Sequence, residues 1–281
     1  MRWDFGKVYK EIRQSKGLTQ EEVCGDMLAR STLARIESGQ AIPKFDTFLF
    51  LLRQINMNLE EFEYICNLYQ PSERQEILNT ANTNISIVDS TELMALKDQC
   101  QNYLLTHHDI PIQQLLERLN VTIHVRKFGG KSPNNTFKET TQKIWQYLEK
   151  QDTWYKNDFK LLSTILYHFP LETLDNITPK ILENLEKYNN LYNIKPLQLT
   201  LLTNLASIYL DNHHLKECER FSLKAYELAK ELKRYDFLGI SQVRLGICRK
   251  DDTLINQGMT LLRLTEENDI LKALEEELKT R

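Results

Sequence analysis

Residues 18–43 read LTQEEVCGDMLARSTLARIESGQAIP, and this stretch decides the fold of the first part of the chain. Thr19 followed three residues later by Glu22 is a capping box, which predicts a helix over 20–26. Gly39 ends a second helix over 30–38, because glycine adopts the left-handed conformation of a helix C-cap at no steric cost. Two short helices joined by a tight turn are typical of a helix-turn-helix.

Three further short helices are predicted around this pair. The first, over 4–16, has Phe5, Val8, Tyr9 and Ile12 at the spacing of one buried helical stripe. The second is predicted over 46–55, and the third follows Asn58. Asn58 is the cap of that last helix and Glu61 stands at its third position. Residues 1–67 are therefore expected to form one domain of five small helices.

The same residues resemble the phage-repressor (XRE, lambda-repressor-like) class of helix-turn-helix domains. The typical pattern of that class is LTQEELA…SxSxISRIExGxxxP, and the chain has LTQEE at 18–22, RSTLARIESG at 30–39 and IP at 42–43. Two features depart from the class. The turn is one residue shorter than in most members, and Ala29 stands where Ser or Thr usually caps the recognition helix.

The resemblance implies a double-stranded DNA operator as partner. Arg30, Ser31 and Arg35 match positions that face base edges in the major groove, where arginine bonds guanine O6 and N7 together. Gln20 is expected to hold a phosphate at the start of its helix. The expected DNA-binding residues are Arg13, Lys16, Gln20, Arg30, Ser31, Thr32, Arg35 and Lys44.

Arg13 has two alternative roles. In repressors of this class its counterpart pairs with the glutamate of the RIE sequence, which is Glu37 here. Such an ion pair would orient the recognition helix from inside the domain. The alternative is a direct contact between Arg13 and a DNA phosphate. Loss of Arg13 abolishes DNA binding under either role, so binding assays alone do not separate them.

The rest of the chain is expected to be all-α. Only 9 of the 281 residues are Gly and 7 are Pro, too few for the frequent turns of a sandwich, barrel or propeller. Residues 68–88 are expected to be a linker with a short helix over 73–78, and 89–281 a run of helices. Within that run, 120–128 is expected to be irregular or a frayed helix end. Thr178 and Pro179 are expected to start a helix that reaches Tyr192.

One segment of this run shows a repeat. Leu205, Ala206, Tyr209, Cys218 and Ala225 fit the packing positions of a tetratricopeptide helix pair, and a weaker pair follows over 236–266. Such pairs stack into a superhelix whose concave face binds extended peptides. The expected peptide-binding residues are Thr200, Thr203, Asn204, Ser207, Ser241 and Arg244. For Asn204 the alternative is a tie between neighbouring helices, and for Arg244 a solvated or interhelical position.

A repressor-like head on degenerate tetratricopeptide-like repeats resembles the Rgg/GadR/MutR regulators of the peptide-sensing group. IWQYL at 144–148 and WY at 154–155 match a stretch typical of that family, although 157–159 departs from it. The resemblance implies a homodimer, a short hydrophobic signalling peptide (quorum sensing) and promoter control, with RNA polymerase as a further candidate partner. Two alternatives stay open: repeats that dock a protein instead of a peptide, and an interaction scaffold that no longer binds DNA.

Several other classes are disfavoured. No CxxC pair, phosphate-binding glycine loop or GxSxG occurs, and the adjacent histidines at 107–108 and 213–214 do not share a helix face. We therefore expect no catalytic residue, no metal and no cofactor. No apolar run approaches the length of a membrane span, and the five cysteines are an odd number far apart. A cytosolic protein with reduced thiols and no membrane partner is expected.

Overall fold

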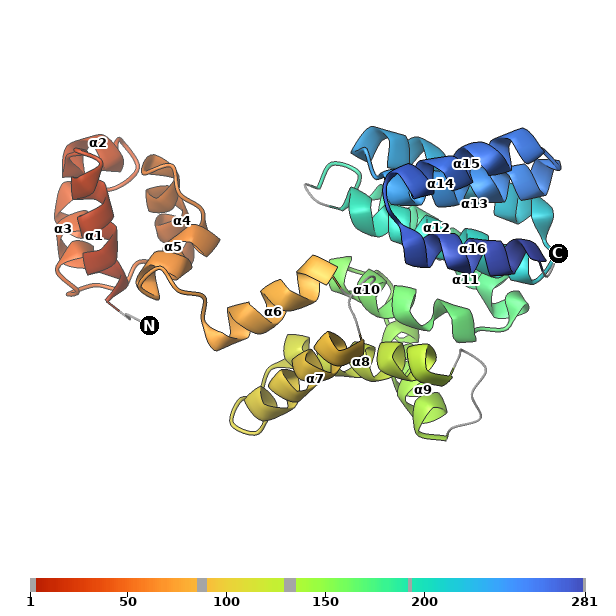
Figure 1. Cartoon of the computed structure of the whole chain (residues 1–281). Helices are drawn as coiled ribbons and strands as arrows, with labels where there is room; N and C mark the ends of the chain where they lie inside the picture. The colour runs from red at the N-terminus through yellow and green to blue at the C-terminus, as the bar shows by residue number, and fades with distance from the viewer. Residues whose placement is uncertain (1–3, 85–89, 129–134, 192–193, 280–281) are drawn as a thin grey trace. The chain divides into compact units, whose positions relative to one another are not determined.

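Five short helices, which we call the head, build the first part of the chain (Figure 1). The computed structural model describes residues 4–84, 90–128, 135–191 and 194–279. The head consists of α1 (Phe5–Ser15), α2 (Gln20–Cys24), α3 (Arg30–Glu37), α4 (Phe45–Gln54) and α5 (Leu59–Cys66). Its core contains the apolar stripe that the sequence predicted on α1, including Val8, Tyr9 and Ile12, packed with Leu33 of α3 and Leu51 of α4.

The predicted caps of the head are confirmed. The Thr19 hydroxyl accepts a hydrogen bond from the Glu22 amide at 3.2 Å, and the Glu22 carboxylate accepts one from the Thr19 amide at 2.7 Å. The Asn58 side chain accepts from the Glu61 amide at 2.8 Å. Gly39 adopts φ +76°, and no side chain caps α3 at Ala29. The starts of α2 and α5 therefore follow from local hydrogen bonding.

Gly6 allows α1 and α3 to pack at close range. A Cβ at position 6 would overlap the backbone carbonyl oxygen of Ile36. We expect Gly6→Ala to destabilise the head by about 1–3 kcal/mol, because two helix backbones would have to separate. Thermal unfolding of the full chain by circular dichroism tests this, with Lys7→Ala at an exposed position of the same helix as control. Equal stability of the two variants would contradict this account of the α1–α3 contact.

Most of the remaining helices are longer than those of the head, and no strand occurs in the described residues. They are α6 (Glu73–Asn84), α7 (Ser90–Leu104), α8 (Ile110–Phe128), α9 (Asn135–Glu149), α10 (Lys156–Ile165), the 3-10 turn η1 (Leu166–His168), α11 (Leu171–Glu186), α12 (Lys195–Asp211), α13 (Leu215–Leu232), α14 (Tyr235–Arg249), α15 (Asp252–Leu264) and α16 (Asn268–Lys279). The contacts divide the chain into two units, Met1–Ile112 and Gln113–Arg281. This division lies inside α8.

Two local predictions in this part were wrong. Residues 120–128 are not irregular: α8 continues to Phe128, because Val121 is buried in the core of the second unit and Val125 packs against it. Pro179 does not start a helix but lies inside α11, which ends at Glu186. The Thr178 hydroxyl donates back to the Leu174 carbonyl at 2.7 Å instead of capping a new helix. Tertiary packing overrode the local signals at both places.

The helix that follows the head is also longer than predicted. The sequence predicted a short helix over 73–78, whereas α6 runs to Asn84 and packs against α7. Arg74 of α6 forms an ion pair with Asp109 at 2.6 Å, and Asp109 also accepts a hydrogen bond from the Ile112 amide. The residue that caps α8 therefore also holds α6.

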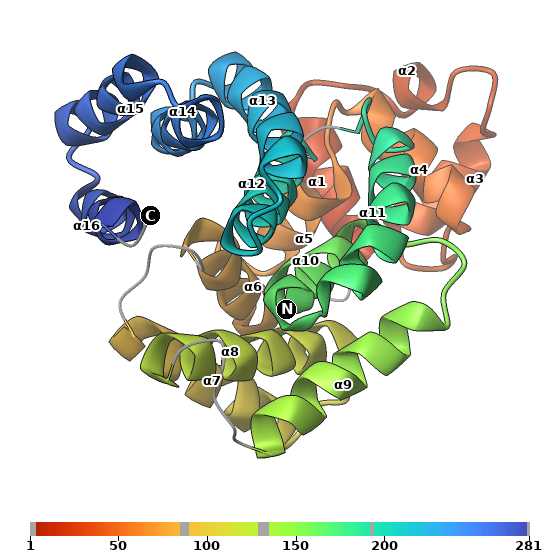
Figure 2. The same cartoon turned by 90° about the vertical axis from the view of Figure 1, so that its right-hand side faces the viewer.

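The predicted tetratricopeptide-like packing is present in the pair α12–α13. All five residues of the predicted packing set are buried, and the Tyr209 ring stacks on Phe221 with centroids 5.5 Å apart. Figure 2 shows the next pair, α14 and α15, beside α13. Glycines form the contact inside that pair: a Cβ at Gly258 would stand 2.6 Å from the carbonyl oxygen of Gly239, and one at Gly246 would stand 2.5 Å from the Ile255 side chain. We call Gly239, Gly246 and Gly258 the glycine seam.

Candidate DNA-binding surface and ligand-binding face

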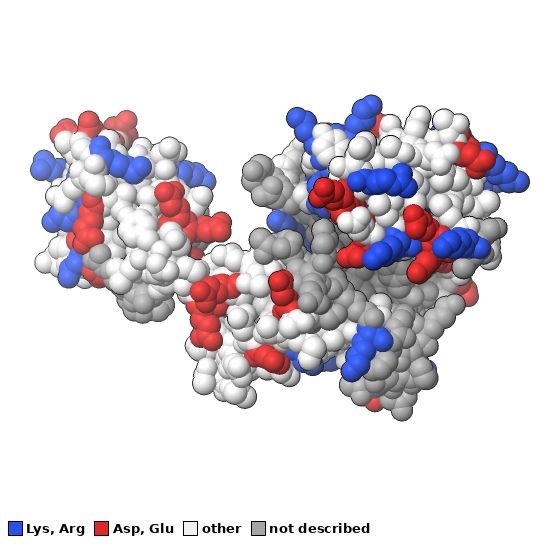
Figure 3. Space-filling model, viewed as in Figure 1, with Lys and Arg blue, Asp and Glu red and all other residues white. Residues whose placement is uncertain are grey.

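The outer face of α3 is polar and exposed. Arg30, Ser31, Thr32 and Arg35 are exposed, whereas Leu33, Ile36 and Glu37 of the same helix are buried. Lys16 and Lys44 are exposed as well. No ion pair among the described residues uses any of these four basic side chains, so their charges remain available to a phosphate or a base edge. In Figure 3, Lys and Arg lie along the edge of the head that carries α3.

A buried ion pair holds α3 against α1. Arg13 Nε donates to Glu37 Oε1 at 2.6 Å and Nη2 to Glu37 Oε2 at 2.9 Å. Nη1 donates to the Leu18 carbonyl at 2.5 Å. Arg13 is 6% exposed and Glu37 is 2% exposed. The predicted ion pair is confirmed, and burial of Arg13 favours this structural role over direct contact with a phosphate.

Gln20 connects this pair to Arg30 at the start of α3. Its amide nitrogen donates to Glu37 Oε2 at 2.8 Å, and its amide oxygen lies 3.5 Å from Arg30 Nε. Glu37 thereby receives hydrogen bonds from both Arg13 and Gln20. The Gln20 side chain is positioned by these contacts at the start of α2, next to an arginine expected to read bases. Its contact with a phosphate stays a prediction.

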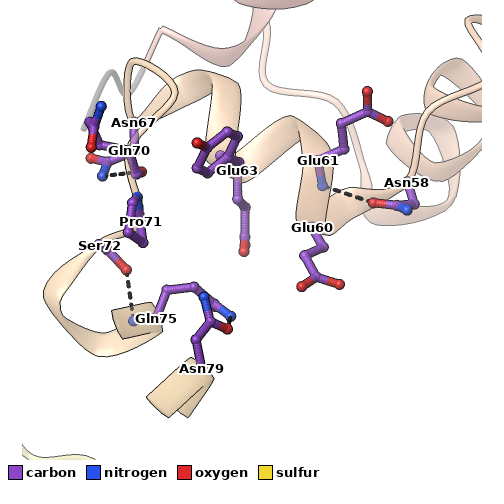
Figure 4. Close-up of a pocket in the computed structure, with 11 residues that line it drawn as sticks. Asn58, Glu60, Glu61, Glu63, Asn67, Gln70, Pro71, Ser72, Gln75 and Asn79 are labelled. Atoms are coloured by element: carbon purple, nitrogen blue, oxygen red, sulfur yellow. Dashed lines mark hydrogen bonds between the residues drawn. The ribbon is translucent and has the colours of Figure 1, made fainter. Parts of the chain in front are cut away.

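The first unit also has a polar cavity of about 290 Å³ between α5 and the start of α6. Figure 4 shows Glu60 and Glu63 pointing toward Gln75 and Asn79 across this cavity. Gln75 donates to Asn79 at 2.8 Å. Carboxylates repel DNA phosphates, so this acidic side of the head is not part of the candidate DNA-binding surface.

The six predicted peptide-binding residues lie on α12 and α14. We call five of them, together with Tyr167 of η1, the inner strip: Thr203, Asn204, Ser207, Ser241, Arg244 and Tyr167. Thr200 is on the same helix but its hydroxyl donates to Pro196 O at 3.0 Å. Thr203 and Ser207 likewise donate to carbonyls one turn back at 2.9 Å each. These hydroxyl oxygens can therefore serve a ligand as acceptors.

Asn204 and Arg244 both connect helices. Asn204 Nδ2 donates to the Ser163 carbonyl of α10 at 3.3 Å, and Arg244 Nη1 donates to the Thr203 carbonyl at 3.1 Å. Each of these bonds is the interhelical alternative that the sequence left open. Asn204 still has a second amide hydrogen and its oxygen for a ligand. Its role in binding a peptide stays a prediction.

Three further polar residues of the second unit were not singled out from the sequence. Tyr167 lies beside Ser207 and near Arg244, and 47% of its surface is exposed. Arg118 on α8 has a buried Nε, and Lys160 on α10 lies near it. The local sequence pattern does not predict a role for these residues, because they lie on different helices and only the fold determines which side chains surround them.

No group of His, Cys, Asp and Glu in the described residues has the arrangement of a metal site. The five cysteines are free thiols, and burial raises the pKa of Cys100 to about 11. None of the described helices has both the length and the hydropathy that crossing a bilayer requires.

A helix-turn-helix head followed by a helical repeat domain defines the class of helix-turn-helix transcriptional regulators. Residues 10–62 match the helix-turn-helix family model, and residues 72–236 match the model of the C-terminal domain of the HTH-type transcriptional regulator Rgg. The second match covers more than half of the chain. The chain therefore belongs to the Rgg family of transcriptional regulators, and not to a family of enzymes.

Solved structures share this fold over the whole chain. A putative transcriptional regulator from Listeria monocytogenes has a TM-score of 0.73 at 19% identity, with 100% of this chain and 97% of that chain covered. Bacillus thuringiensis PlcR in complex with the peptide PapR7 and DNA has 0.69 at 17%, covering 96% and 98%. The Streptococcus dysgalactiae SHP pheromone receptor Rgg2 has 0.65 at 14%, covering 98% and 99%. These likenesses confirm the all-helical, repressor-plus-repeat fold.

Proposed function

We propose that this transcriptional regulator binds operator DNA through α3 and is controlled by a short signalling peptide bound at the inner strip. The exposed basic face of α3, held in place by the buried Arg13–Glu37 pair, is the observation that carries the DNA-binding part. As proposed, residues 1–67 read DNA, 68–88 link, and 89–281 bind the peptide and form a homodimer, whose two heads contact successive half-sites. RNA polymerase is a further proposed partner.

The peptide part of the proposal has a different support. PlcR was solved with a peptide and DNA, and Rgg2 is described as a pheromone receptor, so one protein of this fold binds a peptide and another binds a pheromone. Differential affinity of the peptide for two dimer geometries would shift their populations and thereby DNA affinity. A protein partner docked on the repeats is the second candidate. Tyr235 of α14 and Leu264 of α15 are exposed, and they offer apolar surface that a protein could cover.

Titration of DNA from upstream of the protein's own coding sequence separates these candidates. The protein is titrated against labelled DNA with and without short hydrophobic peptides encoded by neighbouring reading frames. We expect one of these peptides to change both the DNA affinity and the melting temperature. If DNA binds but no peptide changes either quantity, the peptide part of the proposal is contradicted and the protein-docking alternative is favoured.

Arg35→Ala tests the placement of the recognition helix. We expect specific DNA binding to weaken by about 1–3 kcal/mol, because a bidentate contact from arginine to guanine is lost. Fluorescence anisotropy against operator and scrambled DNA measures the change, at fixed salt concentration. Arg263→Ala, an exposed arginine in the repeat domain, removes the same charge and serves as control. Unchanged operator affinity of Arg35→Ala would show that α3 does not read bases at this position.

A further inference from the structure

The side-chain amide of Gln20 has a fixed orientation. Its Nε2 donates to Glu37 Oε2 at 2.8 Å, and the same carboxylate accepts two hydrogen bonds from Arg13. An ionised carboxylate only accepts hydrogen bonds, so the nitrogen and not the oxygen of the Gln20 amide has to face Glu37. The Gln20 oxygen therefore faces away from the carboxylate, where it can accept a hydrogen bond from a donor on another helix.

Arg30, the first residue of α3, supplies that donor. Its Nε donates to Gln20 Oε1 at 3.5 Å. Arg30 is exposed and Gln20 is half-buried, whereas Glu37 is 2% exposed. Hydrogen bonds thus connect the buried ion pair to an exposed arginine of the candidate DNA-binding surface. One hydrogen bond between partly exposed side chains adds little to folding stability, so its main consequence is the direction in which Arg30 points.

The bond at Nε decides which atoms of Arg30 remain for DNA. Arginine carries its N–H donors in a rigid planar fork, and the bond to Gln20 uses the one on Nε. The two terminal nitrogens remain, and their spacing suits guanine O6 and N7 together. An arginine that nothing holds can turn to a phosphate instead, and a phosphate carries no sequence information. Holding Nε therefore favours the base over the phosphate.

The same orientation makes the Gln20 side chain a poor ligand for a phosphate. A phosphate oxygen accepts hydrogen bonds, and the Gln20 atom on the side of Arg30 is an oxygen that accepts them as well. The Gln20 nitrogen is bonded to Glu37. The geometry therefore supports a role through Arg30 better than the phosphate contact that the sequence pattern implies for Gln20.

We propose that Gln20 is a positioning residue for base recognition: it holds Arg30 toward a guanine and acts on DNA through Arg30. The inference rests on the proposed function, because it requires α3 to lie in the major groove. It adds the residue that gives Arg30 its preference for a base. Loss of the Gln20 amide should then lower the specificity of binding and leave the contribution of phosphates intact.

The test first finds the guanine that Arg30 contacts. Duplexes that the full-length protein selects from randomised DNA supply the operator. Each guanine of this operator is replaced in turn by an analogue with a carbon in place of N7, which removes one of the two acceptors. Fluorescence anisotropy at fixed salt concentration measures the affinity. The partner of Arg30 is the guanine whose replacement weakens binding by the wild type but not by Arg30→Met.

Gln20→Met keeps a side chain of similar length and removes both polar atoms. We expect the preference for that G·C pair over A·T to fall about fivefold or more, within what a bidentate contact contributes to discrimination. The dependence of affinity on salt concentration should stay the same or become steeper, because a released Arg30 can bind a phosphate. In an Arg30→Met background, Gln20→Met should not change the preference further.

Two further variants complete the test. Gln54→Met removes an exposed glutamine amide from α4 of the same domain, and it should keep both the preference and the salt dependence. Gln20→Lys retains a donor for Glu37 but has no acceptor for Arg30. It should therefore lose the guanine preference, and it keeps the test valid if Gln20→Met fails to fold. Hydrogen exchange of α1 and α3 shows which variants are folded.

The other outcomes overturn the inference. An unchanged preference with a salt slope lower by about one would identify Gln20 as a phosphate ligand. An unchanged preference with an unchanged slope would show that Gln20 has no part in binding. An effect of Gln20→Met that persists in full in the Arg30→Met background would show that Gln20 does not act through Arg30. If the operator is bound but no guanine responds to Arg30→Met, the proposed contact between Arg30 and a base fails as well.

Discussion

Replacing Arg13 with alanine is expected to unfold the head, and loss of DNA binding will follow from that. The substitution leaves Glu37 buried with its charge facing no cation, and it removes the hydrogen bond to the Leu18 carbonyl. Breaking one partner out of a buried pair costs about 3–5 kcal/mol. This is a large share of the stability of a small domain. Hydrogen exchange measured by mass spectrometry on the full chain should show α1 and α3 deprotected.

The double variant Arg13→Met with Glu37→Met separates the two roles of Arg13. Two apolar side chains of similar volume can replace a buried ion pair with little loss of stability. We therefore expect the double variant to recover most of the protection of α1 and α3, and with it measurable DNA binding. A folded double variant that binds no DNA would instead support a direct contact between Arg13 and a phosphate. Arg35→Ala, exposed on α3, should leave hydrogen exchange unchanged.

Tyr209→Ala is expected to have the largest effect in the repeat domain. The ring is 2% exposed and stacks on Phe221, and its hydroxyl donates to Asp175 at 2.7 Å. Removing a buried aromatic side chain of this size leaves a cavity and costs about 3–5 kcal/mol. Differential scanning calorimetry should show a lower melting temperature for the second unit. Hydrogen exchange should locate the loss in α12 and α13.

Tyr209→Phe is the matched control for this variant. It keeps the ring in the core and removes only the hydroxyl that bonds Asp175. A typical hydrogen bond contributes about 1 kcal/mol net, so the phenylalanine variant should lie between wild type and alanine. If both variants lower the melting temperature equally, the hydroxyl and not the packing of the ring holds α12, α11 and α13 together.

The head could be predicted from sequence almost to the residue, because its helix ends are fixed locally. Thr19 with Glu22, Asn58 and Gly39 each satisfy backbone groups within a few residues of themselves. The Arg13–Glu37 ion pair could also be predicted, because the resemblance to the repressor class identifies both residues of the pair. What pattern did not show is the bond from Gln20 to Glu37. That contact depends on the angle between α2 and α3.

In the repeat domain, sequence predicted the regular helix pair well and the earlier helices less well. Leu205 and Tyr209 follow a repeat, whereas Val121 and Val125 have side chains that favour strands in isolation. Val121 is buried and Val125 packs against the same core, and this packing is decided by helices far away in sequence. The same reason hides Arg118 and Lys160. The two cations lie on different helices, and the spacing of residues within one helix does not predict which residues of another helix lie close to it.

The glycine seam between α14 and α15 restricts which substitutions can accumulate in this protein during evolution. Every substitution of a glycine adds at least one carbon, and at Gly258 that carbon would meet the backbone oxygen of Gly239. A mutation at the Gly258 codon is therefore not tolerated without movement of the two helices, whereas at Gly239 the nearest atoms belong to the side chain of Leu262. A second substitution in a neighbouring residue can relieve such a clash. At Gly239, a smaller residue in place of Leu262 would make room for the new carbon. Among descendants of this gene, exchanges at 239 should then be accompanied by exchanges at 262, as a linked pair of mutations.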